Sequence, residues 1–239
     1  MHESPAQIEL LQVREVSPLL QGLSEEELRD LATAGHVRLT PAGSFLFKQG
    51  NPAELLYLVT RGKVLFYRVT PGGRRALLDV ARPGDAIGSQ GLIGETYFFT
   101  AEALVDSASV GWDGKTLARL IQAHPRLAVS AVRQAVTRMF ELSEICSELI
   151  GDPAEQRLAS ALLRLAAKLG EPIQGSVRIA GLSEEDIGGM VGLSLFTTNR
   201  ILRKWRGQGI LRTGRREILI LQLVELKRVV GDDAGSAQS

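Results

Sequence analysis

"SEEDIGGMVGLSLFTTNRILRKWRGQGIL", residues 183–211, decides how the C-terminal part of the chain folds. Ser183 followed by Asp186 is a helix start signal, because the two residues can satisfy each other's free backbone N–H groups. Gly192 can take the positive φ that a sharp turn requires. Ser194 can cap a second helix. The stretch therefore predicts two short helices joined by a tight turn.

The second of these helices has two unlike faces. Residues at helical spacing predict a side that faces a core: Thr198, Ile201, Leu202 and Trp205. The other side is polar and basic, with Lys204 and Arg206 on its flanks: Phe196, Asn199, Arg200 and Arg203. A short helix of this kind suits insertion into a DNA major groove. An ordinary solvated helix is the alternative reading.

Composition and charge narrow the class of protein. The chain has 239 residues, of which 44% are hydrophobic and 23% charged, typical of a soluble globular protein with two domains. It contains no apolar run of about 18 residues that could span a bilayer. The stretch "MHESPAQIELLQ" lacks the pattern of a secretory signal, and one cysteine excludes a disulfide framework, so we expect a cytoplasmic protein without a membrane partner.

The net charge of +1 hides an uneven distribution. Residues 1–30 carry seven acidic and two basic side chains. Residues 195–228 carry nine Lys/Arg and two Glu, a formal charge of +7. A basic region of this density next to the candidate groove-reading helix favours attraction to DNA phosphates.

The N-terminal half combines helix with short strands. Residues 6–35 are predicted to be helical, with a second capping signal at Ser24 and Glu27 and Gly35 as the stop. The next ninety residues show β-rich runs with glycine turn signals about every ten residues, which predicts a sandwich, barrel or roll. "TPGGRRA", residues 70–76, is predicted to be a hairpin tip, and residues 98–112 a single strand that closes the sheet.

Residues 126–151 are predicted to form one long helix with an uninterrupted heptad seam. The seam comprises Ala128, Val132, Ala135, Met139, Leu142, Cys146 and Leu149. It favours a two-fold coiled coil, with packing of the helix against its own sheet as the alternative. At a seam position, Cys146 either can link two subunits on oxidation or is a small apolar residue of the interface.

After this helix, Asp152 and Pro153 are predicted to be the N-cap and first residue of another helix. It has Leu158, Leu162, Leu165 and Leu169 on one face and ends at Gly170. "ILRTGRREILIL", residues 210–221, is predicted to be a hairpin with its turn near Thr213–Gly214, packed beside the groove-reading helix as a wing. The polar residues 231–239 are predicted to be disordered.

The predicted fold class is therefore α+β, with a double-stranded, jelly-roll-like β-roll, a long dimerisation helix and a winged helix-turn-helix. We expect a β-roll effector or sensor domain over residues 1–125, a dimerisation coiled-coil helix over 126–151 and a winged helix-turn-helix DNA-binding domain over 152–230.

This order of elements resembles the CRP/FNR family of bacterial transcription regulators, from about Ser17 to Leu221. Four stretches carry the resemblance: residues 45–75, "RPGDAIG" at 82–88, "LARLIQAHPRL" at 117–127 and residues 184–211. The resemblance implies a homodimer that binds a two-fold-related site on double-stranded DNA and contacts RNA polymerase. It implies a regulator and not an enzyme.

The chain departs from the members of the family that respond to cyclic AMP. Those members place a Glu and an Arg-Ser pair around the nucleotide, where this chain has Ser89, Phe99 and Thr100. A phosphate buried without a cation is very costly, so we do not expect cyclic AMP to bind. Leu142 replaces the Thr of a Thr-Ser pair on the long helix. The expected effector pocket comprises Gly88, Ser89, Phe99, Thr100 and Leu142.

The few cysteines and histidines of the chain limit which metal-containing cofactors it can use as a sensor. Members with an iron–sulfur cluster use four cysteines, which Cys146 alone cannot supply. A haem- or nitric-oxide-responsive regulator stays as an alternative, although His2, His36 and His124 each fit an ordinary surface histidine. The run Tyr97-Phe98-Phe99 fits either the lining of an apolar effector cavity or the core of the roll.

The groove-reading helix also departs from the family. Leu195 and Phe196 stand where members commonly have Arg-Glu, whereas Arg200 matches the Arg one turn later. Arg200 is therefore the best candidate to read guanine, and Phe196 could touch a thymine methyl group. Ser194 and Thr197 are expected to bind phosphate at the helix start, and Lys204 at the groove wall. The complete DNA-contacting set comprises Ser194, Phe196, Thr197, Asn199, Arg200, Arg203 and Lys204.

Two other function classes share features with this chain. A nucleotide-binding signalling module without DNA binding would share the β-roll but leaves the basic C-terminal part without a role. A metal-dependent enzyme on a β-barrel needs His and carboxylate ligands at fixed spacing on neighbouring strands. The roll has no His pair at such a spacing, so we expect no metal site and no enzyme activity.

Overall fold

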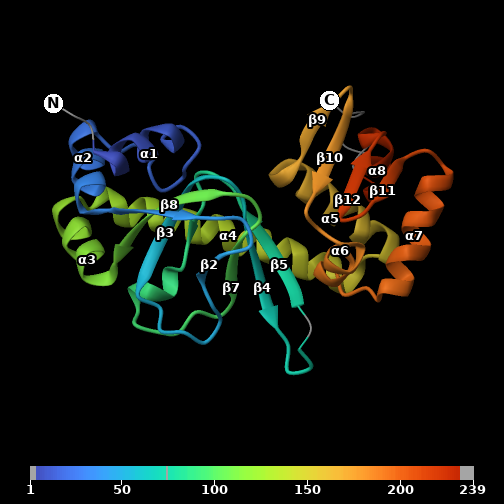
Figure 1. Cartoon of the computed structure of the whole chain (residues 1–239), viewed down its shortest axis with the longest axis horizontal. Coiled ribbons are helices and arrows are strands. Elements are labelled where there is room, and N and C mark those ends of the chain that lie inside the picture. Colours follow the sequence, from blue (N-terminus) through green and yellow to red (C-terminus); the bar gives the residue numbers. More distant parts are fainter. Residues whose placement is uncertain (1–3, 74, 232–239) are drawn as a thin grey trace. The chain divides into compact units, whose positions relative to one another are not determined.

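The structure is a computed structural model that describes residues 4–73 and 75–231 (Figure 1). Its contacts divide the chain into two compact units, residues 1–74 with 79–141, and residues 75–78 with 142–239. The mixed α/β architecture confirms the predicted fold class. Among the described residues, no helix is both long enough and apolar enough to cross a membrane.

The first unit begins with two helices where the sequence predicted one continuous helical region. They are α1 (Pro5–Val13) and α2 (Glu25–Ala34). Pro18 disfavours helical backbone at the residue before it, and Gly22 has a φ of 79°, so residues 14–24 leave the helix. The capping box at α2 is confirmed: the backbone N–H of Ser24 donates to Glu27 Oε2 at 2.7 Å, and that of Glu27 to Ser24 Oγ at 3.2 Å.

Gly35 ends α2, as predicted, but for a reason that the sequence did not show. Its φ is −92°, so it does not use the left-handed conformation of a typical glycine cap. A Cβ atom on Gly35 would lie 2.5 Å from Val110 Cγ1 and 2.8 Å from Trp112 Nε1. The buried Trp112 in turn donates from Nε1 to the carbonyl of Leu31 at 2.8 Å. The glycine therefore provides space for the core.

Two four-stranded sheets form the predicted β-roll (Figure 1). In order, one sheet contains β1 (His36–Thr40), β8 (Ser107–Asp113), β3 (Leu55–Arg61) and β6 (Ala86–Ile87). The other contains β2 (Phe45–Phe47), β7 (Thr100–Ala103), β4 (Val64–Val69) and β5 (Arg75–Ala81). The paired strands run antiparallel wherever their register is defined, for example His36 opposite Gly111.

One strand prediction in the roll is wrong. Residues 98–112 form no single strand, because the chain turns at residues 104–106 and passes from β7 in one sheet to β8 in the other. The predicted hairpin tip does lie between β4 and β5; Arg74, at that tip, is outside the described residues.

A short 3-10 turn, η1 (Ser89–Leu92), precedes β7, and α3 (Gly114–Ala123) follows β8. Asp113 caps α3 by accepting from the backbone N–H of Thr116 at 2.9 Å. The chain breaks at His124 and Pro125, as predicted, and α4 then covers Arg126–Gly151, the predicted bounds of the long helix.

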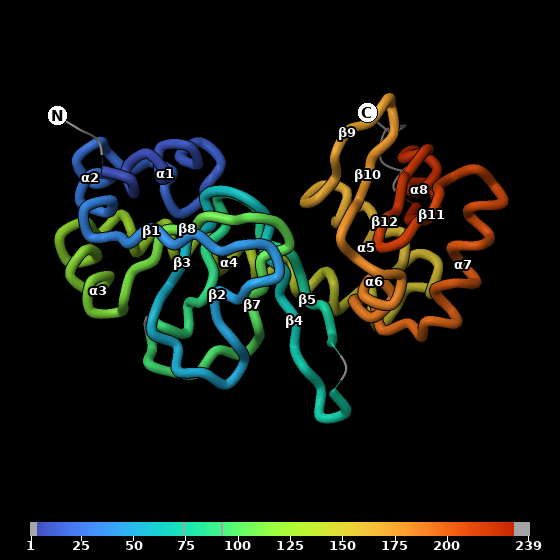
Figure 2. The backbone as a smooth tube through the Cα atoms, viewed as in Figure 1, coloured from blue at the N-terminus to red at the C-terminus, as the bar shows by residue number. Residues whose placement is uncertain are grey.

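In the second unit, helices pack on a small sheet. Figure 2 traces the backbone from α5 to α8. Its helices are α5 (Ala154–Leu169), α6 (Glu184–Met190), α7 (Leu195–Gly207) and α8 (Leu223–Val230). Its sheet has the order β11 (Leu211–Gly214), β12 (Glu217–Ile220), β10 (Ser176–Ala180) and β9 (Glu171–Ile173). The sequence pattern predicted neither α8 nor the β9–β10 hairpin.

The start of α5 differs from the prediction. Pro153 is the N-cap, with no side-chain capping bond, so Asp152 does not cap the helix. The four leucines predicted to share one face of α5 are confirmed as buried: Leu158, Leu162, Leu165 and Leu169.

The wing hairpin is confirmed, but its turn lies at Arg215–Arg216, where Arg216 has a φ of 54°. Gly214 already pairs with Glu217, so Thr213 and Gly214 belong to β11. Of the tail predicted to be disordered, residues 232–239 lie outside the described residues.

Candidate nucleic-acid interface

The helix-turn-helix forms from local interactions that the sequence predicted. At α6, the backbone N–H of Asp186 donates to Ser183 Oγ at 3.1 Å, and that of Ser183 to Asp186 Oδ2 at 2.9 Å. Gly192, in the turn, has a φ of 68°. At α7, the backbone N–H of Thr197 donates to Ser194 Oγ at 3.1 Å. These bonds fix where both helices begin.

The two helices touch at a glycine that the sequence analysis did not single out. A Cβ atom on Gly188 would lie 2.0 Å from Thr198 Oγ1 and 3.0 Å from Thr198 Cβ. Thr198 is fully buried and donates from Oγ1 to the carbonyl of Ser194 at 3.0 Å, so its side chain has little room to move. A glycine inside a helix was the available sequence signal, because it costs helix stability without a packing reason.

We expect Gly188→Ala to destabilise the second unit by about 1–3 kcal/mol, because the added methyl group overlaps Thr198. Gly189→Ala is the matched control in the same helix, since a Cβ atom there meets no atom within 4 Å. Alanine should leave stability unchanged or raise it by up to about 1 kcal/mol at that position. Thermal unfolding of the full chain measures both. Equal stabilities of the two variants would contradict the close contact.

The two faces of α7 separate as the spacing predicted. The core-facing residues are 5% exposed or less: Thr198, Ile201, Leu202 and Trp205. On the opposite face Phe196 is 79% exposed, and Arg200 and Arg203 are exposed too. Neither guanidinium makes a hydrogen bond or ion pair with any residue that the structure describes. Their donors are therefore available to an acceptor outside the domain.

The first turn of α7 is already partly satisfied internally. Ser194 Oγ and Thr197 Oγ1 lie 3.0 Å apart and form a hydrogen bond, in addition to the cap bond. Asn199 is half-buried. These three residues lie at the predicted surface, and their contacts with DNA stay a proposal.

Lys204 lies in a different environment from the one predicted. Its Nζ atom is 2.8 Å and 2.9 Å from the two carboxylate oxygens of Glu155, in the first turn of α5. Trp205 Nε1 also donates to Glu155 Oε1, at 2.9 Å. Since this ion pair partners the charge of Lys204 within the domain, we no longer propose Lys204 as a phosphate contact.

The basic surface continues onto the wing hairpin. Arg212 and Arg215 are exposed there. Arg216 instead donates to the carbonyl of Gly181, with its closer nitrogen at 2.6 Å, and Arg206 donates to Thr213 Oγ1 at 2.8 Å. The wing hairpin therefore exposes the guanidinium groups of Arg212 and Arg215. Those of Arg216 and of Arg206 on α7 instead form hydrogen bonds within the domain.

The long helix α4 exposes the predicted heptad seam. Val132 is 62% exposed, and Met139, Leu142 and Leu149 are 37–56% exposed. Ala135 and the free thiol of Cys146 are exposed as well, and Ala128 is half-buried. The structure adds further exposed apolar residues beside the seam: Val129, Val136, Phe140 and Ile150. Such a continuous apolar stripe is unusual for a surface exposed to water.

One residue of the predicted effector pocket, Phe99, lies in an aromatic cluster of the roll. The ring of Phe47 stacks on Tyr97 with 3.9 Å between centroids, and Phe99 lies 5.7 Å from Phe47 and 4.9 Å from Phe66. Tyr97 donates to the carbonyl of Leu55 at 2.9 Å, and burial raises its pKa. Tyr97 thus belongs to the core of the roll and the half-buried Phe99 packs against that core, whereas Phe98 is exposed.

None of the other predicted pocket residues forms a hydrogen bond with a positively charged side chain in the described part of the chain. Thr100 is buried and accepts at Oγ1 from the backbone N–H of Gln49 at 3.1 Å. Gly88 has a φ of 80° and packs its backbone against Leu55, while Ser89 is exposed. Leu142 lies in the second unit. The contacts at Phe99 and Thr100 are therefore with aromatic rings and a backbone amide, not with a positive charge.

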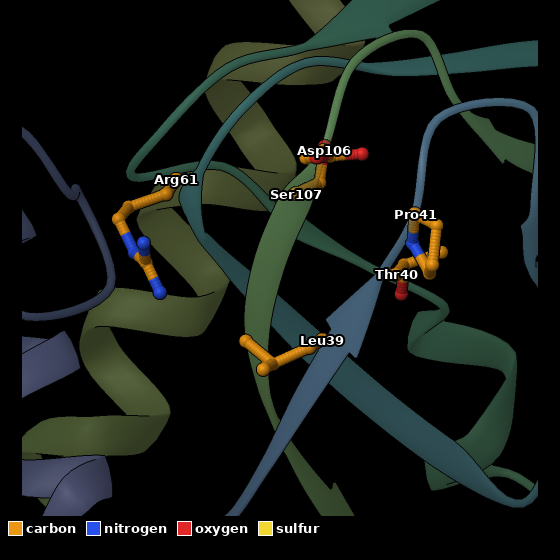
Figure 3. A pocket seen from close by; sticks show the side chains of 6 residues that line it. All are labelled: Leu39, Thr40, Pro41, Arg61, Asp106 and Ser107. Atoms are coloured by element: carbon orange, nitrogen blue, oxygen red, sulfur yellow. The ribbon is translucent and has the colours of Figure 1, made fainter.

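A separate depression of about 280 Å³ lies on the surface of the first unit (Figure 3). It is lined by Leu39, Thr40, Pro41, Arg61, Asp106 and Ser107. Arg61 Nη2 is 2.8 Å from Glu9 Oε1, and Asp106 accepts from the backbone N–H of Ala42 at 2.9 Å. Both charged groups are thus already partnered within the unit, so the depression is a poor anion site.

The histidines give no support to a haem site. His124 Nε2 lies 2.9 Å from Asp30 Oδ2, and its other ring nitrogen lies 4.0 Å from Glu27. His36 is exposed at the start of β1, and His2 lies outside the described residues. Over residues 4–73 and 75–231, His, Cys, Asp and Glu form no group of three or more that could hold a metal ion.

Two family models match this chain, one in its N-terminal part and one in its C-terminal part. Residues 37–124 match the model of the cyclic nucleotide-binding domain, and residues 156–229 match that of the Crp-like helix-turn-helix domain. A CRP-like cAMP-activated global transcriptional regulator of Mycobacterium tuberculosis is 28% identical over 190 residues, covering 79% of this chain and 85% of the relative. A cyclic AMP receptor protein of Thermus thermophilus is 27% identical over 214 residues, covering 89% and 96%.

Solved structures share the fold. A CRP/FNR family transcriptional regulator of Thermus thermophilus superimposes with a TM-score of 0.73 at 23% identity, covering 82% of this chain and 98% of the other.

Proposed function

Since the chain belongs to the CRP/FNR family of DNA-binding transcription regulators, we propose that it acts as a homodimer on a two-fold symmetric operator. We propose further that α7 reads the operator, and that the effector is neither cyclic AMP nor an iron–sulfur cluster. RNA polymerase is the proposed partner on the basis of the family resemblance.

The exposed face of α7 is the observation that carries this proposal. Arg200 and Arg203 project from the same side as Phe196, and neither has a hydrogen-bond or ion-pair partner within residues 4–73 and 75–231. Residues 195–216 contain seven Lys/Arg and no Asp or Glu. A basic helix that follows a tight turn and keeps its donors free supports insertion into the major groove of DNA.

The apolar stripe on α4 supports the homodimer. Its seam residues recur at heptad spacing, and the structure leaves them exposed, so a second copy of the helix would bury them. A two-fold axis between paired helices would also give each operator two related half-sites.

Selection of bound sequences from random DNA tests the proposal. The purified chain should enrich an inverted repeat whose half-site centres are one helical turn, about 34–36 Å, apart. Binding should weaken steeply as salt rises, because phosphate contacts release counterions. Failure to enrich any sequence would refute operator recognition, whereas enrichment of a single half-site without symmetry would refute the dimer.

We expect no binding of cyclic AMP, in contrast to what the names of several relatives state of those proteins. Phe99 packs against the aromatic core and Thr100 binds a backbone amide, so neither offers a cation to the cyclic phosphate. Isothermal titration calorimetry should show no binding heat at millimolar nucleotide, in a preparation that still binds operator DNA. A micromolar dissociation constant would contradict this expectation.

A haem- or nitric-oxide-responsive regulator of the same family stays as the alternative for the effector. The hydrogen bond between His124 and Asp30 does not favour axial ligation of haem by His124. An absorption spectrum of the purified chain after addition of haem tests this alternative, because axial ligation by a side chain shifts and sharpens the Soret band of free haem.

A further inference from the structure

The first turn of α7 exposes two large apolar side chains, Phe196 at 79% and Leu195 at 47%. Single exposed apolar residues are common on protein surfaces, so exposure alone identifies no partner. The position of Phe196 is more informative. It lies four residues before Arg200, hence on the same face of the helix, and at the N-terminal end of a helix that we propose enters a groove.

The surroundings of Phe196 define the chemistry of its partner. Seven cations and no acidic residue lie between residues 195 and 216. Arg200 and Arg203 on the Phe196 face have no partner among the described residues. A complementary surface therefore carries negative charge together with small apolar groups. In the major groove of DNA, phosphates supply the charge, and the C5 methyl group of thymine is the apolar group on the base edges.

Building on the proposed function, we infer that Phe196 determines operator specificity by packing against a thymine methyl group. The ring lies one helical turn from Arg200, so its thymine should lie within one or two base pairs of the guanine that Arg200 reads. The expected half-site thus requires a thymine near a guanine.

Replacement of thymine by deoxyuridine tests this contact, because it removes the methyl group and leaves the pairing unchanged. Each thymine of the selected operator would be replaced in turn, in both half-sites, and the affinity of the wild-type chain measured. At one position the affinity should fall about fourfold per half-site and about fifteenfold for both, as expected for loss of one buried methyl group. Phe196→Ala should bind the thymine and uracil operators equally.

Phe98→Ala is the matched control, because Phe98 is another exposed aromatic residue, 58% exposed, but lies in the first unit. It should keep the wild-type response to deoxyuridine. The wild-type titration needs no variant, so misfolding of Phe196→Ala would not obscure the result.

The outcomes separate this inference from the proposed function. A selected operator whose thymines can all be replaced without loss would overturn the role of Phe196 and leave operator recognition intact. Persistence of the full uracil penalty in Phe196→Ala would also overturn it, by assigning the methyl contact elsewhere. If the wild-type chain enriched no sequence, both the proposed function and this inference would fail.

Discussion

Arg200→Ala is expected to weaken binding to the selected operator by about 1–3 kcal/mol per half-site and to remove the preference at one base pair. Arg200 is exposed on the outer face of α7 and has no partner in the described part of the chain, so its five donors are free to bind guanine O6 and N7. Titration of the selected operator and of a scrambled one, at several salt concentrations, measures both effects.

Lys204→Ala is the control on the same helix. Because Lys204 is ion-paired with Glu155, its removal should leave base preference unchanged and the salt slope close to that of the wild type. If Arg200→Ala weakened both DNAs equally, Arg200 would contact phosphate instead of a base. Arg203 would then be the next candidate for base reading. A Lys204→Ala salt slope lower by about one per subunit would instead assign Lys204 to a phosphate contact.

The double replacement of Val132 and Leu142 by lysine is expected to dissociate the homodimer. Both residues lie on the α4 seam and are 62% and 49% exposed in the single chain, so the change places charges in the proposed interface without disturbing the fold of one subunit. Sedimentation velocity should show a monomer at micromolar concentration. Operator affinity should fall about a hundredfold or more, because two linked half-site contacts become independent.

Thr137→Lys is the matched control on α4. Thr137 is exposed but lies two residues from Ala135, away from the seam, and its replacement should preserve the dimer. Circular dichroism would verify that both proteins are folded. A Val132→Lys/Leu142→Lys variant that remains a dimer would show that the subunits associate through another surface.

The sequence predicted those features that depend on neighbours a few residues apart. The bounds of α4 and the capping boxes at Ser24 and Ser183 agree with the structure. A heptad pattern lies within one helix, and a capping box joins residues only three positions apart. For the same reason the buried and exposed faces of α7 followed from its helical spacing.

Only the tertiary structure decided which distant residues meet. Lys204 pairs with Glu155 across 49 positions, and Gly188 leaves space for Thr198 on the next helix. Phe47 and Tyr97 lie 50 residues apart and stack in the core of the roll. Such contacts depend on how helices and sheets pack, and hydrophobic burial, which drives packing, has no fixed sequence spacing. Local patterns thus determined the bounds of α4 and the exposed side of α7, whereas packing decided which charged groups of that side are already paired.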